Sequence, residues 1–233
     1  MKIEAYGATD IGKVRKTNQD SFLVDQKNHL YIVADGIGGA KGGDKASRLC
    51  IEILSESIQK NQYQKPSDFL KQAFQKTNEF IFEEAKTERE LRGMGTTGTA
   101  LYIHEGKAYC AHVGDSRAYL FRDGGLWQLT EDHTLAAQKM KRGISSNETN
   151  VLIRSLGVEG NVKIDQLYRK LHKNDIFLLC SDGLTSHIKN NGLARLLNQS
   201  AINEIPDHLI NEANNQGGED NITVLVVHII DTK

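Results

Sequence analysis

Apolar, strand-like runs that end on an aspartate are the feature of this sequence that most constrains its fold. Each run can pack inside a sheet, while the turn at its end carries the carboxylate out of the core. A carboxylate beside buried strands is costly unless something compensates its charge. Four runs share this pattern, and their aspartates are Asp35, Asp115, Asp182 and Asp220. No basic run lies nearby to neutralise them all, so the sequence predicts divalent cations, and oxygen ligands suit Mg²⁺ or Mn²⁺ better than zinc.

Short turns between the strand-like runs indicate antiparallel pairing. Strands are expected at 2–9, 21–25, 30–35, 97–104, 107–114, 117–122, 126–129, 162–168, 175–180 and 221–230. The turns at 105–106 and 123–125 are too short for the crossover that parallel strands require. Helices are expected after the glycine cluster 36–43, from a cap at Ser67 or Asp68, near 134–142, and twice within 188–216. The second of these is expected to bury the face that includes Phe74, Phe80 and Ile81. Blocks of antiparallel strands separated by helices predict an α+β layered fold.

Composition limits the possible classes of function. The chain has 233 residues, only two prolines and no low-complexity linker, so we expect one domain over 1–233. A formal net charge of −1 gives no electrostatic case for nucleic acid or an anionic membrane. The N-terminus lacks the apolar segment of a signal peptide, and no apolar stretch is long enough to span a bilayer, so a cytoplasmic protein is expected. Three widely spaced cysteines in apolar contexts, Cys50, Cys110 and Cys180, fit buried reduced thiols.

Eight motifs in a fixed order carry a specific resemblance to a known family. They are GKVRKTNQDSF (12–22), ADGIGG (34–39), MGTTGTAL (94–101), HVGDSRAYL (112–120), LTEDHTL (129–135), IRSLG (153–157), LLCSDGLT (178–185) and GGEDNITVLVV (217–227). Together they resemble the metal-dependent protein serine/threonine phosphatases of the PP2C family, in their bacterial form. The resemblance implies a four-layer α-β-β-α sandwich, in which two central antiparallel sheets are flanked by helices and a metal cluster lies at one end.

The resemblance also implies the metal ligands. Asp35 matches the carboxylate that bridges two Mn²⁺ or Mg²⁺ ions, and the Gly36 carbonyl matches a ligand of the first ion. Asp182 and Asp220 match ligands of the second ion. Asp115, together with Asp182, matches the residues that hold a third, weaker ion in bacterial members. Taken singly, an Asp-Gly pair is more often an ordinary turn than a metal ligand, Asp220 could merely cap a turn, and Asp115 could pair with Arg117.

Two further residues are assigned roles by the same motifs. Asp20 matches an acid that orients metal-bound waters from behind the ligands. Arg15 matches the residue that grips the substrate phosphate, for which a planar guanidinium fork is well suited. From the residues alone, an ion pair between Arg15 and a nearby acid stays open. The implied reaction is hydrolysis of phosphoserine or phosphothreonine by direct attack of a hydroxide shared by two ions, without a phospho-enzyme.

One position departs from the animal-type pattern. Ile37 stands where those members have a histidine thought to protonate the leaving group, so the general acid is left unassigned. His133 is expected to order a loop rather than to act in catalysis. Thr96 and Thr97 are expected to hydrogen-bond the backbone beside the site. The glycines at 36–43 lack the GKS or GKT ending of a nucleotide-binding loop, which argues against nucleotide binding.

The resemblance suggests a cellular role as well as a reaction. We expect a monomer that acts on phosphoprotein substrates and opposes a cognate bacterial serine/threonine kinase. Segment 136–155 corresponds to a mobile flap beside the active site, and its polar composition fits either substrate contact or a solvated loop. Two alternatives are a pseudo-phosphatase that binds without turnover and a regulator that dephosphorylates one dedicated partner. Turnover in the presence of metal distinguishes the first alternative from an enzyme.

Overall fold

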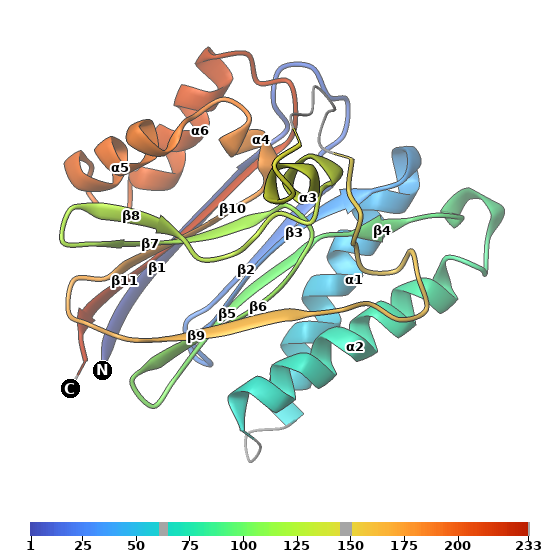
Figure 1. Ribbon diagram of the computed structural model, residues 1–233, viewed down its shortest axis with the longest axis horizontal. Helices are drawn as coiled ribbons and strands as arrows, with labels where there is room; N and C mark the ends of the chain where they lie inside the picture. The colour runs from blue at the N-terminus through green and yellow to red at the C-terminus, as the bar shows by residue number, and fades with distance from the viewer. Residues whose placement is uncertain (61–64, 145–150, 233) are drawn as a thin grey trace.

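The computed structural model describes residues 1–60, 65–144 and 151–232, which form four layers in the order helix, sheet, sheet, helix (Figure 1). Two sheets stack face to face, and every strand pair within them is antiparallel. Helices cover the outer face of each sheet. The α+β sandwich expected from the sequence is therefore confirmed.

The first sheet has the order β1-β11-β10-β7-β8, and the second has the order β2-β3-β5-β6-β9. The strands of the first sheet are β1 (Lys2–Asp10), β7 (Arg117–Arg122), β8 (Gly125–Gln128), β10 (Ile176–Cys180) and β11 (Ile222–Asp231). Those of the second are β2 (Asp20–Asp25), β3 (Leu30–Ile37), β5 (Gly98–His104), β6 (Lys107–Val113) and β9 (Asp165–Lys170), with the short β4 (Gly95–Thr96) paired to β3.

Two hairpins follow directly from their turn residues. Glu105-Gly106 joins β5 to β6, and its φ angles are 46° and 71°. Asp123-Gly124 joins β7 to β8, with φ angles of 50° and 77°. Positive φ at both positions matches the twist of the flanking strands, which is why such two-residue turns favour antiparallel neighbours.

Three apolar layers hold the sandwich together. The central one lies between the sheets and includes the fully buried Tyr31, Val33 and Phe177. The outer two lie under the helices on either side. Strand β3 contributes to two layers, because Tyr31 and Val33 face the other sheet while Ile32 faces the helices. A strand buried on both faces has a continuous apolar sequence, and this explains the run at 30–34.

The helices are α1 (Gly39–Lys60), α2 (Pro66–Glu84), α3 (Leu135–Lys141), α4 (Asp182–Thr185), α5 (Asn190–Gln199) and α6 (Ile205–Asn215), with a 3₁₀ turn at Arg89–Leu91. Helix α1 begins inside the glycine cluster rather than after it. At Gly36 an added Cβ would lie 2.1 Å from the Gly43 carbonyl oxygen, so the glycines allow the helix to start directly against the end of β3.

Helix α2 departs from two expectations. Neither Ser67 nor Asp68 caps it, since the helix begins at Pro66, whose fixed φ suits the first helical position. Phe80, expected on the buried face, is 48% exposed, whereas Phe69 is buried against the second sheet. The four-residue helix α4 was not expected, because Asp182-Gly183 resembles a simple turn.

The remaining expectations concern the thiols, membrane-spanning segments and the loop near residue 145. Cys50, Cys110 and Cys180 are free and buried, as predicted. Within 1–60, 65–144 and 151–232, no helix has both the length and the apolar composition to cross a bilayer. Part of the expected mobile loop, residues 145–150, lies outside the described residues.

Candidate active site

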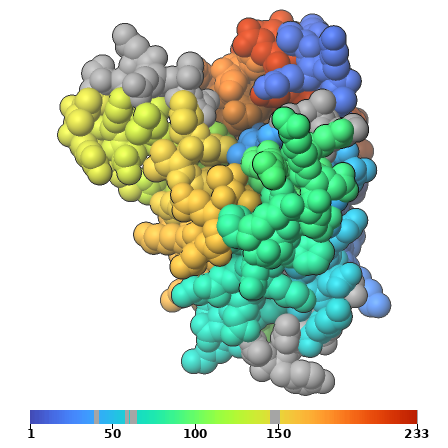
Figure 2. Space-filling view, turned by 90° about the vertical axis from the view of Figure 1, so that its right-hand side faces the viewer, coloured from blue at the N-terminus to red at the C-terminus, as the bar shows by residue number. Residues whose placement is uncertain are grey.

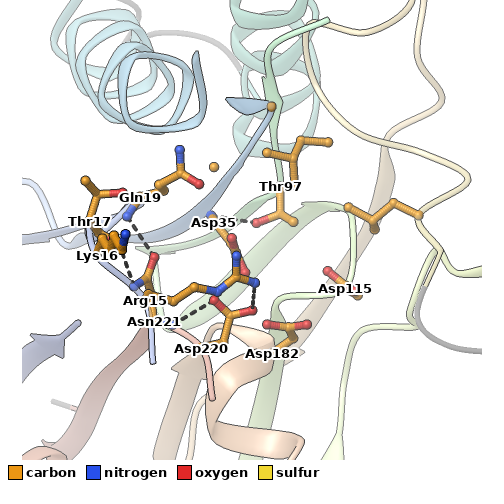
Figure 3. A pocket seen from close by; sticks show the side chains of 14 residues that line it. Arg15, Lys16, Thr17, Gln19, Asp35, Thr97, Asp115, Asp182, Asp220 and Asn221 are labelled. Carbon is orange, nitrogen blue, oxygen red and sulfur yellow. Dashed lines mark hydrogen bonds and ion pairs between the residues drawn. The ribbon is translucent and has the colours of Figure 1, made fainter. Parts of the chain in front are cut away.

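A polar cavity of about 440 Å³ lies at one end of the sandwich, and all four aspartates line it (Figure 3). Asp35 comes from the end of β3 and Asp115 from the connection between β6 and β7. Asp182 begins α4, one residue beyond Ser181, which follows β10, and Asp220 lies just before β11. The structure thus brings together four carboxylates from distant parts of the chain. Asp35 belongs to the second sheet, Asp182 and Asp220 to the first, and Asp115 lies on the connection between the two sheets.

The backbone around Asp35 is held by two threonines. The Asp35 N–H donates to Thr97 Oγ1 (2.9 Å), and Thr96 Oγ1 donates to the Asp35 carbonyl (2.9 Å). The Thr97 N–H donates to the same carbonyl (2.8 Å). Both threonines therefore hydrogen-bond the backbone, as expected from the sequence. Gly36 follows Asp35 and also lines the cavity.

Asp20 lies behind Asp35, directly across the β2–β3 ladder. Its Oδ2 accepts hydrogen bonds from Ser181 Oγ and Thr223 Oγ1, both at 2.7 Å. Its Oδ1 is buried and has no partner among the described residues. Burial raises the pKa of this carboxyl to about 6, although the two hydroxyl donors lower it. A buried carboxylate oxygen without a donor is costly, so this atom marks a place where a further polar group or cation would fit.

The cavity aspartates carry charge that the described side chains do not fully compensate. Burial raises the pKa of Asp35 well above its ordinary range, and the nearby Asp20 and Asp182 raise it further. The pKa of Asp115 rises to about 7, first because of burial and then because of Asp182. Burial and Asp220 also raise the pKa of Asp182. All these effects disfavour the ionised forms, and a bound cation would reverse them.

Arg15 makes an ion pair with one of the four aspartates. Its Nη2 lies 2.7 Å from Asp220 Oδ2, and the guanidinium side chain is 52% exposed. The hydrogen bond to Asp220 raises the pKa of Arg15. The ion pair that the sequence left open therefore exists, and its acid is a candidate metal ligand. Figure 3 shows the guanidinium lying over the cavity, between Asp35 and Asp220.

Arg117 does not pair with Asp115. Its guanidinium instead makes a bidentate interaction with Asp132, with Nε–Oδ1 at 2.8 Å and Nη2–Oδ2 at 2.6 Å, and its Nη1 donates to Tyr119 Oη (3.1 Å). The alternative pairing of Asp115 is therefore wrong. Arg117 is occupied by Asp132, and within the described residues the buried Asp115 has no ion pair with an arginine.

The donor set fits hard divalent cations. The cavity offers carboxylates and the Gly36 backbone, and none of the described residues that line it is a cysteine or histidine. Within the described residues, no three acidic, histidine or cysteine side chains already stand together as a metal-binding group. Like charges that are not neutralised repel one another, so a cation is what would draw these carboxylates together. Asp220 would also have to exchange Arg15 for the metal.

His133 orders the turn that carries Asp115. Its ring Nδ1 accepts from the Gly114 N–H (3.0 Å), and the backbone N–H of His133 donates to the Gly114 carbonyl (2.8 Å). Its Nε2 lies 3.2 Å from Asp165 Oδ2. Since Nδ1 accepts, Nε2 carries the proton in this arrangement. The predicted loop-ordering role of His133 is confirmed.

Asn221 lines the cavity, and its role is not predicted from the sequence. Its Oδ1 accepts from the Gln19 N–H (2.8 Å), and its Nδ2 donates to the carbonyls of Ile11 (2.9 Å) and Thr17 (3.0 Å). One amide therefore fixes the loop that bears Arg15. The only signal in the sequence was its position beside Asp220. Ile37 lines the cavity as well and offers no proton there.

Comparisons with known proteins agree with this geometry. The model of the protein phosphatase 2C family matches residues 12–223. The serine/threonine phosphatase stp of Listeria monocytogenes is 37% identical, over 94% of this chain and 93% of its own length. The crystal structure of the Mycobacterium tuberculosis serine/threonine phosphatase PstP/Ppp superposes with a TM-score of 0.92 at 30% identity, covering 98% of this chain and 99% of that one.

A second solved structure contains metal. The catalytic domain of the serine/threonine protein phosphatase PstP, in complex with two manganese ions, superposes with a TM-score of 0.91 at 33% identity. The match covers 98% of this chain and 99% of that domain. This chain therefore belongs to the protein phosphatase 2C family, and it is a metal-dependent serine/threonine phosphatase.

Proposed function

We propose that the cavity is where this phosphatase hydrolyses phosphoserine and phosphothreonine, using two Mn²⁺ or Mg²⁺ ions. Asp35, the Gly36 carbonyl, Asp182 and Asp220 would hold the two ions, and Asp115 with Asp182 would hold a third, weaker one. The observation that carries the proposal is the convergence of four strand-end aspartates on one cavity beside Arg15. The PstP catalytic domain with two manganese ions supports the number and kind of ion.

Each group of the cavity has a separate task in this scheme. Bound divalent cations supply a water that is ionised at neutral pH and polarise the phosphoryl oxygens. Arg15 would exchange its ion pair with Asp220 for two phosphoryl oxygens of the substrate, which a guanidinium fork can contact together. Asp20, fixed by the hydroxyls of Ser181 and Thr223, would orient water from behind Asp35 through its free Oδ1. Because the side chain of Ile37 has no proton to donate, the leaving oxygen of the serine or threonine would take its proton from water in the cavity.

The physiological setting is part of the same proposal. The substrates would be phosphoproteins, which the names of its relatives, serine/threonine phosphatases, support. The enzyme would oppose a serine/threonine protein kinase. We propose a single catalytic domain over 1–233 that acts as a monomer. Segment 136–155 would be a flap beside the cavity, which is supported by the position of Leu152 in the cavity lining.

Metal-dependent turnover tests the site assignment. Hydrolysis of para-nitrophenyl phosphate and of a phosphothreonine peptide is measured with Mn²⁺, with EDTA, and with Mn²⁺ in Asp182→Asn. Activity is expected only in the first condition. Asp123→Asn is the matched control, because Asp123 sits in an exposed hairpin turn at φ 50°, which asparagine also adopts.

Two outcomes would contradict the proposal. Full activity of Asp182→Asn would remove the cavity from catalysis. An unaltered protein that binds the phosphopeptide in saturating Mn²⁺ but does not hydrolyse it would be a pseudo-phosphatase instead.

A further inference from the structure

Lys16 lines the same cavity as the four aspartates, but the sequence motifs assign it no role. Its side chain is exposed, and within the described parts of the chain its ammonium has no carboxylate or carbonyl partner. Arg15, its neighbour, is already paired with Asp220 at 2.7 Å. Lys16 is therefore the cation of the described cavity lining that is available to an anion without breaking an existing pair.

The backbone that carries Lys16 is fixed on both sides. The Lys13 N–H donates to the Gly218 carbonyl (2.7 Å), and the Thr17 carbonyl accepts from Asn221 Nδ2 (3.0 Å). Figure 2 shows this N-terminal segment, in blue, lying against the red segment that precedes β11. Because the backbone of this loop is already ordered, little backbone entropy is lost when the flexible side chain of Lys16 binds an anion.

The position of Lys16 separates it from the candidate metal ligands. In Figure 3 it lies beside Thr17, on the opposite side of the cavity from Asp115 and Asp182. Arg15 lies between these two sides, over the centre. A substrate phosphoryl at the centre would therefore meet Arg15, and the groups that flank the phosphoresidue would meet Lys16.

Charge balance indicates what Lys16 binds. Among the described residues, four carboxylates and two cationic side chains, Arg15 and Lys16, line the cavity. Two divalent cations would neutralise the four carboxylates and leave both cationic side chains for the substrate. The guanidinium fork suits the phosphoryl group, whereas an ammonium acts as a point charge that accepts any nearby anion.

We propose that Lys16 determines specificity by binding a second anionic group of the substrate next to the phosphoresidue, either an acidic side chain or another phosphoryl group. This rests on the proposed function of the cavity. An exposed ion pair contributes about 0.2–1 kcal/mol, which corresponds to roughly a 1.5- to fivefold preference for the more acidic peptide. Most of the preference should lie in KM, since the contact forms in the bound ground state as well.

The test compares three phosphothreonine peptides that differ only in the flanking residues: neutral, acidic, or carrying a second phosphothreonine. The measured quantity is the ratio of kcat/KM for each anionic peptide to that for the neutral one, with Mn²⁺ present. Lys16→Ala should lower this ratio about 1.5- to fivefold, Lys16→Glu should lower it further, and Lys16→Arg should restore it. Lys13→Ala is the matched control, because Lys13 is an exposed lysine on the same loop that does not line the cavity. It should keep the ratio of the unaltered protein.

Binding of non-hydrolysable phosphonate versions of these peptides, followed by fluorescence anisotropy, separates the two proposals. Loss of turnover with a Lys16-dependent binding preference would overturn the proposed function and keep this one. Normal turnover, with a kcat/KM ratio in Lys16→Ala equal to that of the unaltered protein, would overturn the proposal for Lys16 alone. So would an equal fall of this ratio in Lys13→Ala, because the preference would then come from the general positive charge of the loop. A preference for the doubly phosphorylated peptide over the acidic one, or the reverse, identifies the source of the anion. Raising the salt to 1 M should abolish the preference, because exposed charges are then screened within about 3 Å.

Discussion

Replacing Asp115 by asparagine should stabilise the metal-free protein, although it removes a proposed metal ligand. Folding raises the pKa of Asp115 from 3.8 to about 7, mainly through burial. Between these two values the folded protein holds a proton that the unfolded chain has released. Its stability therefore falls as the pH rises through this window, and the loss is complete above about pH 7. Asparagine does not ionise, so the variant escapes this cost.

The expected size follows from the raised pKa. A difference of about three pH units at about 1.4 kcal/mol each sets a ceiling of about 4 kcal/mol. Because Asp182 contributes to the raised pKa of Asp115 and the two carboxyls titrate together, we expect about half of this ceiling. For a chain of this length, about 2 kcal/mol corresponds to a rise in Tm of about 4–8 °C.

Urea and thermal denaturation in EDTA at pH 5 and pH 7.5 measure the effect. The advantage of Asp115→Asn over the unaltered protein should be larger at pH 7.5 than at pH 5. In saturating Mn²⁺ the order should reverse, because the carboxylate then gains a cation. Asp123→Asn, in an exposed turn, should show neither change. An asparagine variant that is no more stable in EDTA at pH 7.5, or an advantage that does not vary with pH, would refute the reasoning.

Two further substitutions test the surroundings of the cavity. Arg15→Ala should bind Mn²⁺ about 1.5- to fivefold more tightly by calorimetry, since the exposed pair with Asp220 no longer competes, while its KM for phosphopeptide rises. Weaker Mn²⁺ binding would contradict the competition. Gly36→Ala should lose about 3 kcal/mol in urea unfolding, because its Cβ would lie 2.1 Å from the Gly43 carbonyl oxygen and 2.7 Å from that of Gln19. Gly160→Ala, whose Cβ would meet only ordinary contacts from 3.4 Å outward, is the control, and equal stability of both variants would contradict the packing argument.

The parts of the fold that sequence predicts well are those set by local pattern. The hairpins follow from Glu105-Gly106 and Asp123-Gly124, and the continuous apolar run of β3 follows from burial on both faces. The start of α1 among glycines cannot be predicted from local pattern, because glycine has a low helix propensity. It is explained by the close contact between the backbones of Gly36 and Gly43. Burial of Phe69 rather than Phe80 likewise depends on where α2 meets the sheet.

The residues of the candidate site also differ in how far the local sequence reveals them. The aspartates are visible in the sequence because each follows its own apolar run. The pairing of Arg117 with Asp132 joins residues 15 positions apart, and the short sequence distance to Asp115 suggested the wrong partner. Asn221 and Lys16 depend on a loop meeting a segment some 200 positions away, with Asn221 reaching Thr17 across 204 positions. No local pattern encodes such a meeting.

The hydrogen bonds of Asp20 cross from one half of the sandwich to the other. Asp20 begins β2 in one sheet, whereas Thr223 lies on β11 and Ser181 directly follows β10 in the other. The same boundary runs through the cavity, with Asp35 on one side and Asp182 and Asp220 on the other. Any slippage between the two halves would widen the gap between these ligands. Loosened packing deep in the molecule, around Phe177 for example, should therefore weaken ion affinity at a distance, so that ion binding reports on the alignment of the whole sandwich.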